Sequence, residues 1–294
     1  MASYDQQFKV LEVPPIVQEL VGAGVQEPPS QYVLPVQDRP AAAVSEMPEP
    51  IPIIDLSRLS AGSAEEFDKL RSALENWDLF LLSCRGDEGY ERVLQPPAGR
   101  ETEVLKHYIL SEYTIKCKAA ANLVFRNMAK ILNLQEEHLV NMIGDNSITQ
   151  AIFNYYPQCP RPDHVLGLKA HIDGSIITVN FADAEGLQLQ KNGVWYNVPI
   201  VPNALVMNVG DIMEILSNGF FKSLVHRVVT NAEKERLSLV LVYTLELETE
   251  LEPVSELVDD KRPAQYMKIK LHDYMEKYHD TYATGTLAID GVKI

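Results

Sequence analysis

The sequence predicts a mainly β fold with flanking helices, whose core is a double-sheet jelly roll. After Ile148, short apolar runs replace the helical periodicity, and turn residues such as Asn192-Gly193 and Asn218-Gly219 separate them. Asn-Gly between strand-like runs is a strong hairpin signal. Many short strands joined by turns are typical of jelly rolls. A single barrel with added helices accounts for a chain of 294 residues.

Helices and extended chain are expected before this barrel. Region 27–52 is rich in proline, which favours extended backbone and removes hydrogen-bond donors, so it reads as an arm lying over the body. The apolar spacing of Ala64–Asn76 predicts an amphipathic helix, and Ser63 is its expected cap. The other expected elements are a short helix at Val13–Leu20, strands at Ile51–Leu56 and Leu79–Leu82, a long helix at Glu101–Leu132 and a short one at Gln135–Met142.

The barrel strands follow, and the chain ends in a helical tail at Pro263–Tyr282. We expect three regions: an arm and helical part at 1–147, the jelly-roll core at 148–262 and the tail at 263–294. The strands are expected at Ile152–Tyr155, Ile176–Phe181, Gly186–Gln190, Val194–Val198, Ala204–Val209 and Leu237–Tyr243.

Composition limits the partners and the compartment. A net charge of -15 disfavours nucleic acid and anionic membranes, because both attract Lys and Arg patches. Three widely spaced cysteines form neither a disulfide framework nor a zinc motif, which favours a reducing compartment. No apolar run reaches the length of a membrane span. With no clear transit peptide, cytoplasm is the expected location, and a chloroplast address is left open.

Three residues form a candidate metal site. On a strand, His171 and Asp173 would project from the same face because side chains alternate. A His-x-Asp triplet alone is common by chance. His226, however, lies in an apolar strand-like run where an unpaired histidine is costly. Two imidazoles and one carboxylate are the ligand set of non-haem Fe(II) oxygenases, which leaves positions open for reactants.

Arg236 and Ser238 form a candidate anion site. Arg236 follows the charged run Glu233–Glu235, which by itself favours a surface position. Ser238 points to the same side of a strand, and a guanidinium with a hydroxyl suits the distal carboxylate of a small diacid. Asn154 and Tyr156 also share a strand face and could donate further hydrogen bonds, although a core tyrosine and a turn asparagine explain them equally well alone.

Several segments together resemble the plant Fe(II)/2-oxoglutarate-dependent dioxygenases of specialised metabolism. The resemblance runs from about residue 101 to the C-terminus and also includes the arm and Ile51–Phe80. It is nearest to norcoclaurine synthase-like enzymes, opiate O-demethylases and grass melatonin 2-hydroxylases. The motifs that carry it are Asn-Tyr-Tyr-Pro-Gln-Cys-Pro-Arg-Pro at 154–162 and the stretches 166–175, 209–211, 216–219, 222–228 and 231–238.

The resemblance implies a double-stranded β-helix with Fe(II) on His171, Asp173 and His226. It places the co-substrate 2-oxoglutarate on Arg236 and Ser238, with Asn154 and Tyr156 assisting. The implied activity is hydroxylation or O-demethylation of a small aromatic plant metabolite, with melatonin 2-hydroxylation as one candidate, releasing succinate and CO2. Dioxygen is the other reactant, ascorbate is expected to support turnover, and a monomer is the usual state.

The chain departs from this family at two places. Leu81–Gly86 stands where the family has an Asn-His-Gly turn, and the region after residue 83 is shortened by a segment that covers the barrel mouth in relatives. Val242-Tyr243-Thr244-Leu245 replaces the frequent Phe-Tyr-Asn-Pro. A catalytically impaired binding protein that retains its metal is therefore an alternative. A third reading is an enzyme that uses ascorbate in place of 2-oxoglutarate, as aminocyclopropane-carboxylate oxidases do.

Overall fold

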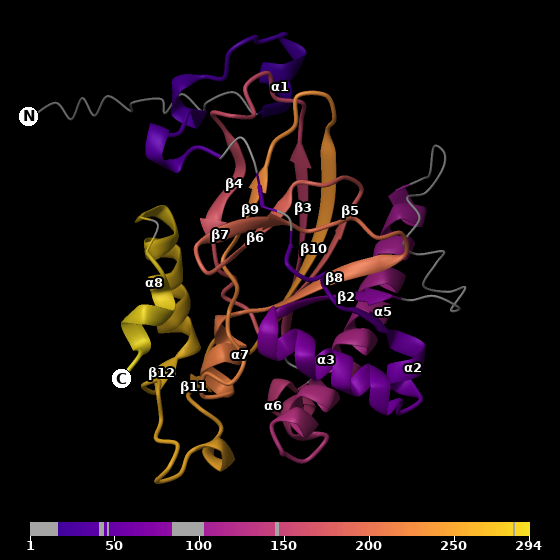
Figure 1. Ribbon diagram of the computed structural model, residues 1–294, viewed down its shortest axis with the longest axis vertical. Coiled ribbons are helices and arrows are strands. Elements are labelled where there is room, and N and C mark those ends of the chain that lie inside the picture. Colours follow the sequence, from indigo (N-terminus) through magenta and orange to yellow (C-terminus); the bar gives the residue numbers. More distant parts are fainter. Residues whose placement is uncertain (1–16, 41–43, 46, 84–102, 145–146, 285) are drawn as a thin grey trace, which may run out of the picture.

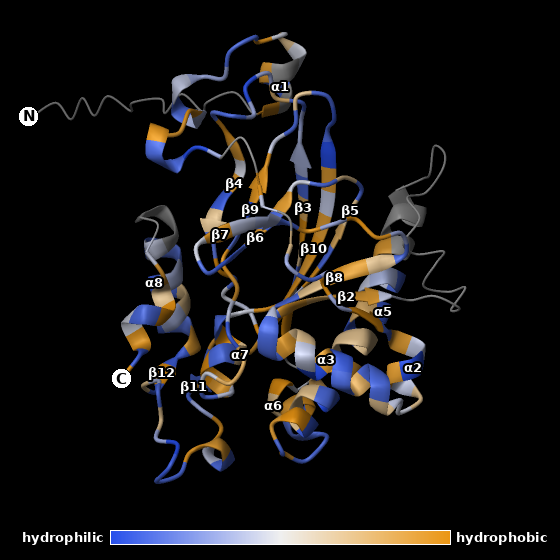
Figure 2. Ribbon diagram, viewed as in Figure 1, coloured by the Kyte–Doolittle hydropathy of each residue, from blue (hydrophilic) through white to orange (hydrophobic). Residues whose placement is uncertain are grey.

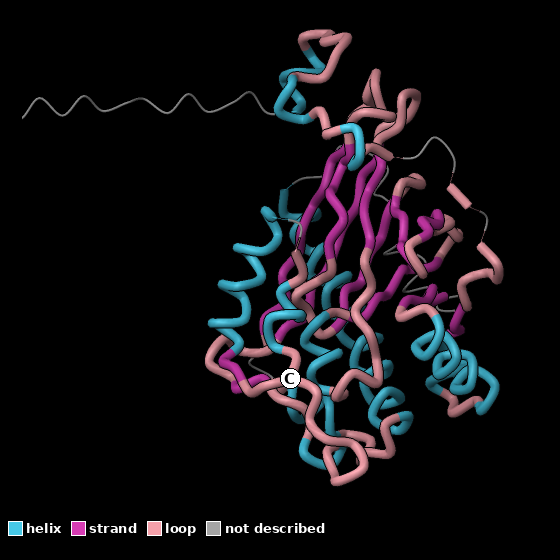
Figure 3. The backbone as a smooth tube through the Cα atoms, turned by 60° about the vertical axis from the view of Figure 1, so that its left-hand side comes forward, coloured by secondary structure: helices cyan, strands magenta, loops and turns pink. Residues whose placement is uncertain are grey.

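Two β-sheets form the body of the molecule, and most helices lie outside the larger sheet (Figure 1). The computed structural model describes residues 17–40, 44, 45, 47–83, 103–144, 147–284 and 286–294. Figure 3 shows the long strands side by side, with helices along their flanks and at one end. The prediction of a mainly β fold with a double-sheet core and flanking helices is confirmed.

The larger sheet has the strand order β1-β2-β8-β5-β10-β3, and the smaller has the order β4-β9-β6-β7. From β3 to β10 the chain passes repeatedly from one sheet to the other, which is the path of a jelly roll. The strands are β1 (Ile53–Asp55), β2 (Leu79–Ser83), β3 (Ile148–Tyr156), β4 (Leu166–His171), β5 (Ile177–Ala182), β6 (Leu187–Lys191), β7 (Val194–Asn197), β8 (Ala204–Val209), β9 (His226–Val229) and β10 (Arg236–Thr244), with β11 (Glu250–Leu251) and β12 (Ile269–Lys270) in a small separate sheet.

Strand β2 is buried on both faces, which explains why its sequence is apolar without alternation. Phe80 and Leu82 pack into the cluster beneath the helices, whereas Leu79 and Leu81 pack into the cluster between the sheets. Figure 2 shows β8, its neighbour, coloured mainly hydrophobic and helix α3 banded in both colours. The larger sheet therefore separates two apolar layers.

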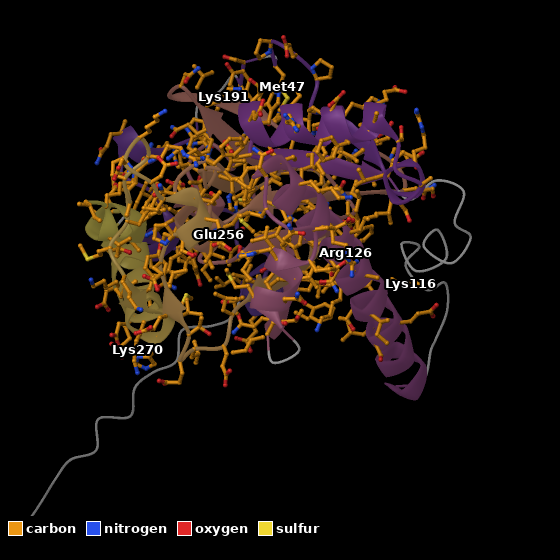
Figure 4. All side chains as sticks on the ribbon, turned by 90° about the horizontal axis from the view of Figure 1, so that it is seen from below. Met47, Lys116, Arg126, Lys191, Glu256 and Lys270 are labelled. Atoms are coloured by element: carbon orange, nitrogen blue, oxygen red, sulfur yellow. The ribbon has the colours of Figure 1, made fainter. Side chains whose placement is uncertain are left out.

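Helix α5 (Glu103–Ile131) covers the outer face of the larger sheet. Its residues Val124, Phe125 and Met128 belong to the same apolar cluster as strand residues of β5 and β10. In the view from below, Lys116 and Arg126 mark the course of this helix (Figure 4). The remaining helices are α1 (Val17–Gly22), α2 (Leu56–Ser60), α3 (Ala64–Asn76), α6 (His138–Ile143), α7 (Asp211–Leu216) and α8 (Leu271–Thr284), with short 3-10 turns at Ser30–Tyr32, Val36–Asp38, Ser255–Leu257 and Ala288–Val292.

The two Asn-Gly pairs differ in role. Asn192 and Gly193, with φ of 52° and 76°, join β6 to β7 as the predicted hairpin turn. Asn218 and Gly219 also have positive φ, but they end helix α7 instead of joining strands, and the Gly219 N–H bonds to the Glu214 carbonyl at 2.8 Å. The hairpin prediction there was wrong, because the same left-handed conformations also close a helix.

Two further predictions needed correction. Strand β4 ends at His171, so Asp173 lies in the turn that follows and not on the strand. The C-terminal helix begins at Leu271, not at Pro263, because the chain before it is extended and ends in β12, which pairs with β11. The helix α7 had not been predicted.

The three-region division stays a prediction. The shortened region expected after residue 83 falls largely on residues 84–102, which lie outside the described residues. The same holds for residues 13–16 of the first predicted helix and for the start of the long helix at 101.

We expect Phe125→Ala to lower the free energy of unfolding by about 3–5 kcal/mol, because it leaves a cavity between α5 and the sheet. Phe125 is 1% exposed, whereas Ile115 on the same helix is 67% exposed. The control Ile115→Ala should change the free energy by less than about 0.5 kcal/mol. Denaturant unfolding measures both, and equal effects would contradict the packing of α5.

Candidate metal and co-substrate site

Two histidines face each other across neighbouring strands of the smaller sheet. His171 and His226 are register partners in β4 and β9, and their ring centres lie 4.2 Å apart. Their Nδ1 atoms lie 2.8 Å and 3.0 Å from the carbonyl oxygens of Lys169 and Leu224. A carbonyl oxygen only accepts, so each Nδ1 carries the hydrogen and each Nε2 keeps its lone pair. Burial also lowers the pKa of His226, which favours the neutral ring that metals bind.

Asp173 joins the histidines from the turn after β4. Its Oδ1 lies 3.6 Å from Nε2 of His171 and 3.6 Å from Nε2 of His226. Its Oδ2 accepts a hydrogen bond from the Asn208 amide at 2.8 Å. Burial would raise the pKa of this carboxyl, but the two imidazoles and the Asn208 amide hold it below its ordinary value. Three potential ligand atoms thus converge within 4.8 Å of one another.

The backbone around Asp173 is held by close packing. The Asp211 N–H donates to the Asp173 carbonyl at 2.8 Å, at the start of α7. A Cβ on Gly210 would come within 2.7 Å of that carbonyl and within 2.4 Å of the Ser175 carbonyl, so only glycine fits. On the other side, the Tyr278 hydroxyl of α8 donates to the Ile172 carbonyl at 2.9 Å. The turn is therefore fixed from both α7 and α8.

A buried guanidinium lies at the far end of the same space. Arg236 is 4% exposed, its Nε donates to the Ala184 carbonyl at 3.0 Å, and its Cζ lies 5.2 Å from the centre of the Tyr156 ring. Its Nη1 is buried and has no hydrogen-bond partner among the described residues. Burial lowers the pKa of Arg236, because the charged guanidinium is removed from water. Such an unpaired cation is costly alone and suits an anionic ligand.

Ser238 and Asn154 lie next to this arginine. The register of β10 and β3 places Arg236 opposite Tyr156 and Ser238 opposite Asn154. The Asn154 amide donates to the Ser238 hydroxyl at 3.2 Å. Both predicted same-face pairs are therefore brought together at one end of the larger sheet.

One cavity of about 340 Å³ between the sheets connects the two groups of residues. That volume is at the lower end of the range of about 300–1,000 Å³ found for ligand sites. The wall includes the triad, Arg236, Ser238, Asn154 and Tyr156, together with residues that the sequence had not indicated, among them Asn208, Asn180 and Tyr278.

Comparison with known proteins identifies the family. The 2OG-Fe(II) oxygenase superfamily profile matches residues 148–244. Lateral Branching Oxidoreductase 1 of Arabidopsis thaliana is 31% identical over 347 aligned positions, which cover 95% of each chain. Codeine O-demethylase of Papaver somniferum is 30% identical and covers 95% of this chain and 96% of its own. This chain belongs to the 2OG-Fe(II) oxygenase superfamily.

It is a 2-oxoglutarate-dependent dioxygenase, and its cofactor and co-substrate are Fe(II) and 2-oxoglutarate. The predicted resemblance to plant enzymes of this family is confirmed. Among solved structures, JOX2 in complex with 2OG, Fe and JA is 26% identical, with a TM-score of 0.75 over 89% of this chain and 93% of that chain. The rice dioxygenase for auxin oxidation, 23% identical with a TM-score of 0.66, shares the fold.

The alignments also bear on the length of the dioxygenase. The match to the Arabidopsis relative extends over 347 positions, 53 more than the 294 residues of this chain. At least that many positions of the relative therefore have no counterpart here. The expected shortening after residue 83 stays a prediction.

We expect Gly210→Ala to weaken divalent-metal binding at least about tenfold, because the added methyl displaces the backbone that holds Asp173. Titration of the metal-free enzyme with Mn²⁺, followed by electron paramagnetic resonance, measures this. A matched control is Gly291→Ala, where the new methyl meets no atom within 4 Å and φ is not positive. Unchanged binding in the first variant would show that the turn tolerates displacement.

Proposed function

We propose that His171, Asp173 and His226 hold the Fe(II) of this dioxygenase. The two Nε2 lone pairs and Oδ1 of Asp173 converge, while Oδ2 is engaged by Asn208. Nitrogen and oxygen donors of this kind suit Fe(II), and three of them leave the remaining positions open toward the cavity. The donor set present in this chain therefore fits the metal of its family.

Arg236 and Ser238 hold the distal carboxylate of 2-oxoglutarate in this proposal, with Asn154 and Tyr156 assisting. The observation that carries it is the buried Nη1 of Arg236, which has no partner among the described residues, on a side chain that lines the cavity containing the triad. A diacid would pair that cation at one end and reach the metal with the other. Its binding would thus remove the cost of an unpaired buried charge.

When bound, Fe(II) and 2-oxoglutarate supply the oxidation, in which dioxygen is consumed and succinate and CO2 are released. The residues of the chain orient the metal ligands and limit water in the cavity. The bonds from the histidine Nδ1 atoms fix the direction of both rings, and Asn208 fixes the carboxylate. The apolar residues Leu168, Leu187 and Val228 line the cavity and limit water beside the reacting groups.

The substrate we propose is a small aromatic plant metabolite that is hydroxylated or O-demethylated, with melatonin as a candidate. Relatives of this chain include codeine O-demethylase and the flavonol synthase/flavanone 3-hydroxylase of Petunia hybrida. The cavity wall supplies Ile152, Val240 and Val242, whose apolar side chains suit a flat apolar ring. Val242 also leaves more room than the phenyl ring expected at this position.

The remaining proposals concern the partners, the oligomeric state and the cellular location of the dioxygenase. The net charge of -15 supports the proposal that the dioxygenase acts on a small molecule and has no nucleic-acid or membrane partners. We also propose that it is a cytoplasmic monomer and that ascorbate supports its turnover. None of the helices in the described part of the chain is long and apolar enough to cross a membrane.

A metal-retaining binding protein is the second candidate function. The observation that favours it is the absence of at least 53 positions that a relative carries, because closure over the substrate depends on segments outside the barrel. Succinate formed when a panel of aromatic metabolites is added supports the oxygenase. No succinate above the substrate-free rate across the panel supports the binding protein.

We expect Asp173→Ala to abolish the charge-transfer absorption that appears when Fe(II) and 2-oxoglutarate are added without oxygen. The band requires the metal and the co-substrate to meet, and the substitution removes one of three ligands. Glu276→Ala, which changes an exposed carboxylate on α8, serves as the control and should leave the band intact. A band that persists in the Asp173 variant rules out this ligand set. Activity that does not depend on added 2-oxoglutarate would favour the ascorbate-dependent reading.

Arg236→Leu should raise the dissociation constant of 2-oxoglutarate about a hundredfold, since it removes a charged hydrogen-bond donor from the anion. Isothermal titration of the Mn²⁺-loaded enzyme measures this without turnover. Arg126→Leu, which breaks the exposed pair with Glu137, should have no effect on the constant. Equal affinities for the Arg236 variant and the wild type would place the co-substrate elsewhere.

A further inference from the structure

Asn180 is a polar residue in the cavity wall that the roles above leave unexplained. It lies on β5, its side chain lines the cavity, and its Oδ1 is buried without a hydrogen-bond partner among the described residues. A buried amide oxygen without a partner costs stability, whereas an apolar side chain of similar size would not. Its neighbour Thr178, by contrast, bonds to the Ser175 hydroxyl at 3.0 Å.

The strand registers give Asn180 a particular place. On β10, Ser238 pairs with Ala182 of β5, and Asn180 is the next residue on the same face of β5. On β8, Asn208 pairs with Thr178, which is again the next residue on that face. Asn180 therefore lies one strand across from Ser238 and one same-face position along. Asn208 lies in the same relation to Asn180.

Asn180 thus lies at the midpoint of a diagonal across the inner face of the larger sheet. One end of the diagonal is Ser238, beside the unpaired guanidinium of Arg236. The other end is Asn208, whose amide holds Asp173. A diacid that extends from the first end toward the second would lie over Asn180.

We infer that Asn180 is a further contact for 2-oxoglutarate and donates a hydrogen bond from its amide to the co-substrate between its anchored carboxylate and the metal. The inference rests on the proposed function, because it needs the diacid to extend from Arg236 to the triad. An amide nitrogen is the right group, since 2-oxoglutarate offers only acceptor oxygens at neutral pH. Because Oδ1 has no bond to lose, the amide is free to turn and present its nitrogen.

The test is Asn180→Leu in the full-length enzyme, loaded with Fe(II) and titrated with 2-oxoglutarate without oxygen. The charge-transfer absorption reports binding, and the dissociation constant should rise about tenfold. The melting temperature of the ligand-free variant should stay the same or rise, because an unpaired buried oxygen has been removed. A residue with only a structural role would give the opposite change in stability.

Gln150→Leu is the matched control. Gln150 lines the same cavity and loses the same amide, but it lies on β3 opposite Val242, away from the diagonal. Its variant should keep the 2-oxoglutarate affinity within about twofold.

Two results would overturn the inference while leaving the proposed function intact: an unchanged dissociation constant in Asn180→Leu, or a lowered melting temperature of that variant without ligand. Failure of the wild-type enzyme to give the absorption with 2-oxoglutarate would instead defeat the proposed function, and the inference with it.

Discussion

The pairing of β4 with β9 is the contact on which the rest of the site depends. It places His171 opposite His226, and bonds from both Nδ1 atoms to nearby carbonyls set which nitrogens face the cavity. Asp173 completes the group because Gly210 leaves room for its carbonyl. Since side chains alternate along a strand, a slip of β9 by one residue would turn His226 out of the cavity. The register of a single strand pair therefore decides whether the two imidazoles meet.

On the inner face of the larger sheet, two buried polar atoms lower the stability of the protein and suit an anionic ligand. Arg236 and Asn180 each bury a polar atom that has no partner among the described residues, in a wall that otherwise contains aliphatic side chains. Each such atom costs free energy in the empty protein, and each lies where an anionic co-substrate would pass. Burial of the two apolar layers, one beneath the helices and one between the sheets, compensates this loss of stability. Unpaired groups in an otherwise well-packed wall are thus informative about what the wall binds.

Much of this site could be predicted from the sequence, because the spacing of residues along a strand determines which side chains share a face. The predicted same-face pairing of Arg236 with Ser238 needed only strand alternation, which holds for β10. The placement of Asp173 on a strand was wrong, because the chain turns after His171 to meet α7, which had not been predicted. Asn208 had no signal in the sequence, since an asparagine in an apolar strand becomes meaningful only when the register shows that it reaches Asp173.

The shortened chain affects the parts of the site unequally. The three triad residues, Arg236 and Ser238 all lie between residues 148 and 244, the range that the family profile matches. Their hydrogen bonds named above also come from within that range or, for Ile172, from α8. A difference in length outside this range therefore leaves these candidate ligand residues in place. At the edge of the larger sheet, β3 leaves Ile152 42% and Phe153 66% exposed. Ile152 also lines the cavity, so this exposed edge forms part of the cavity wall.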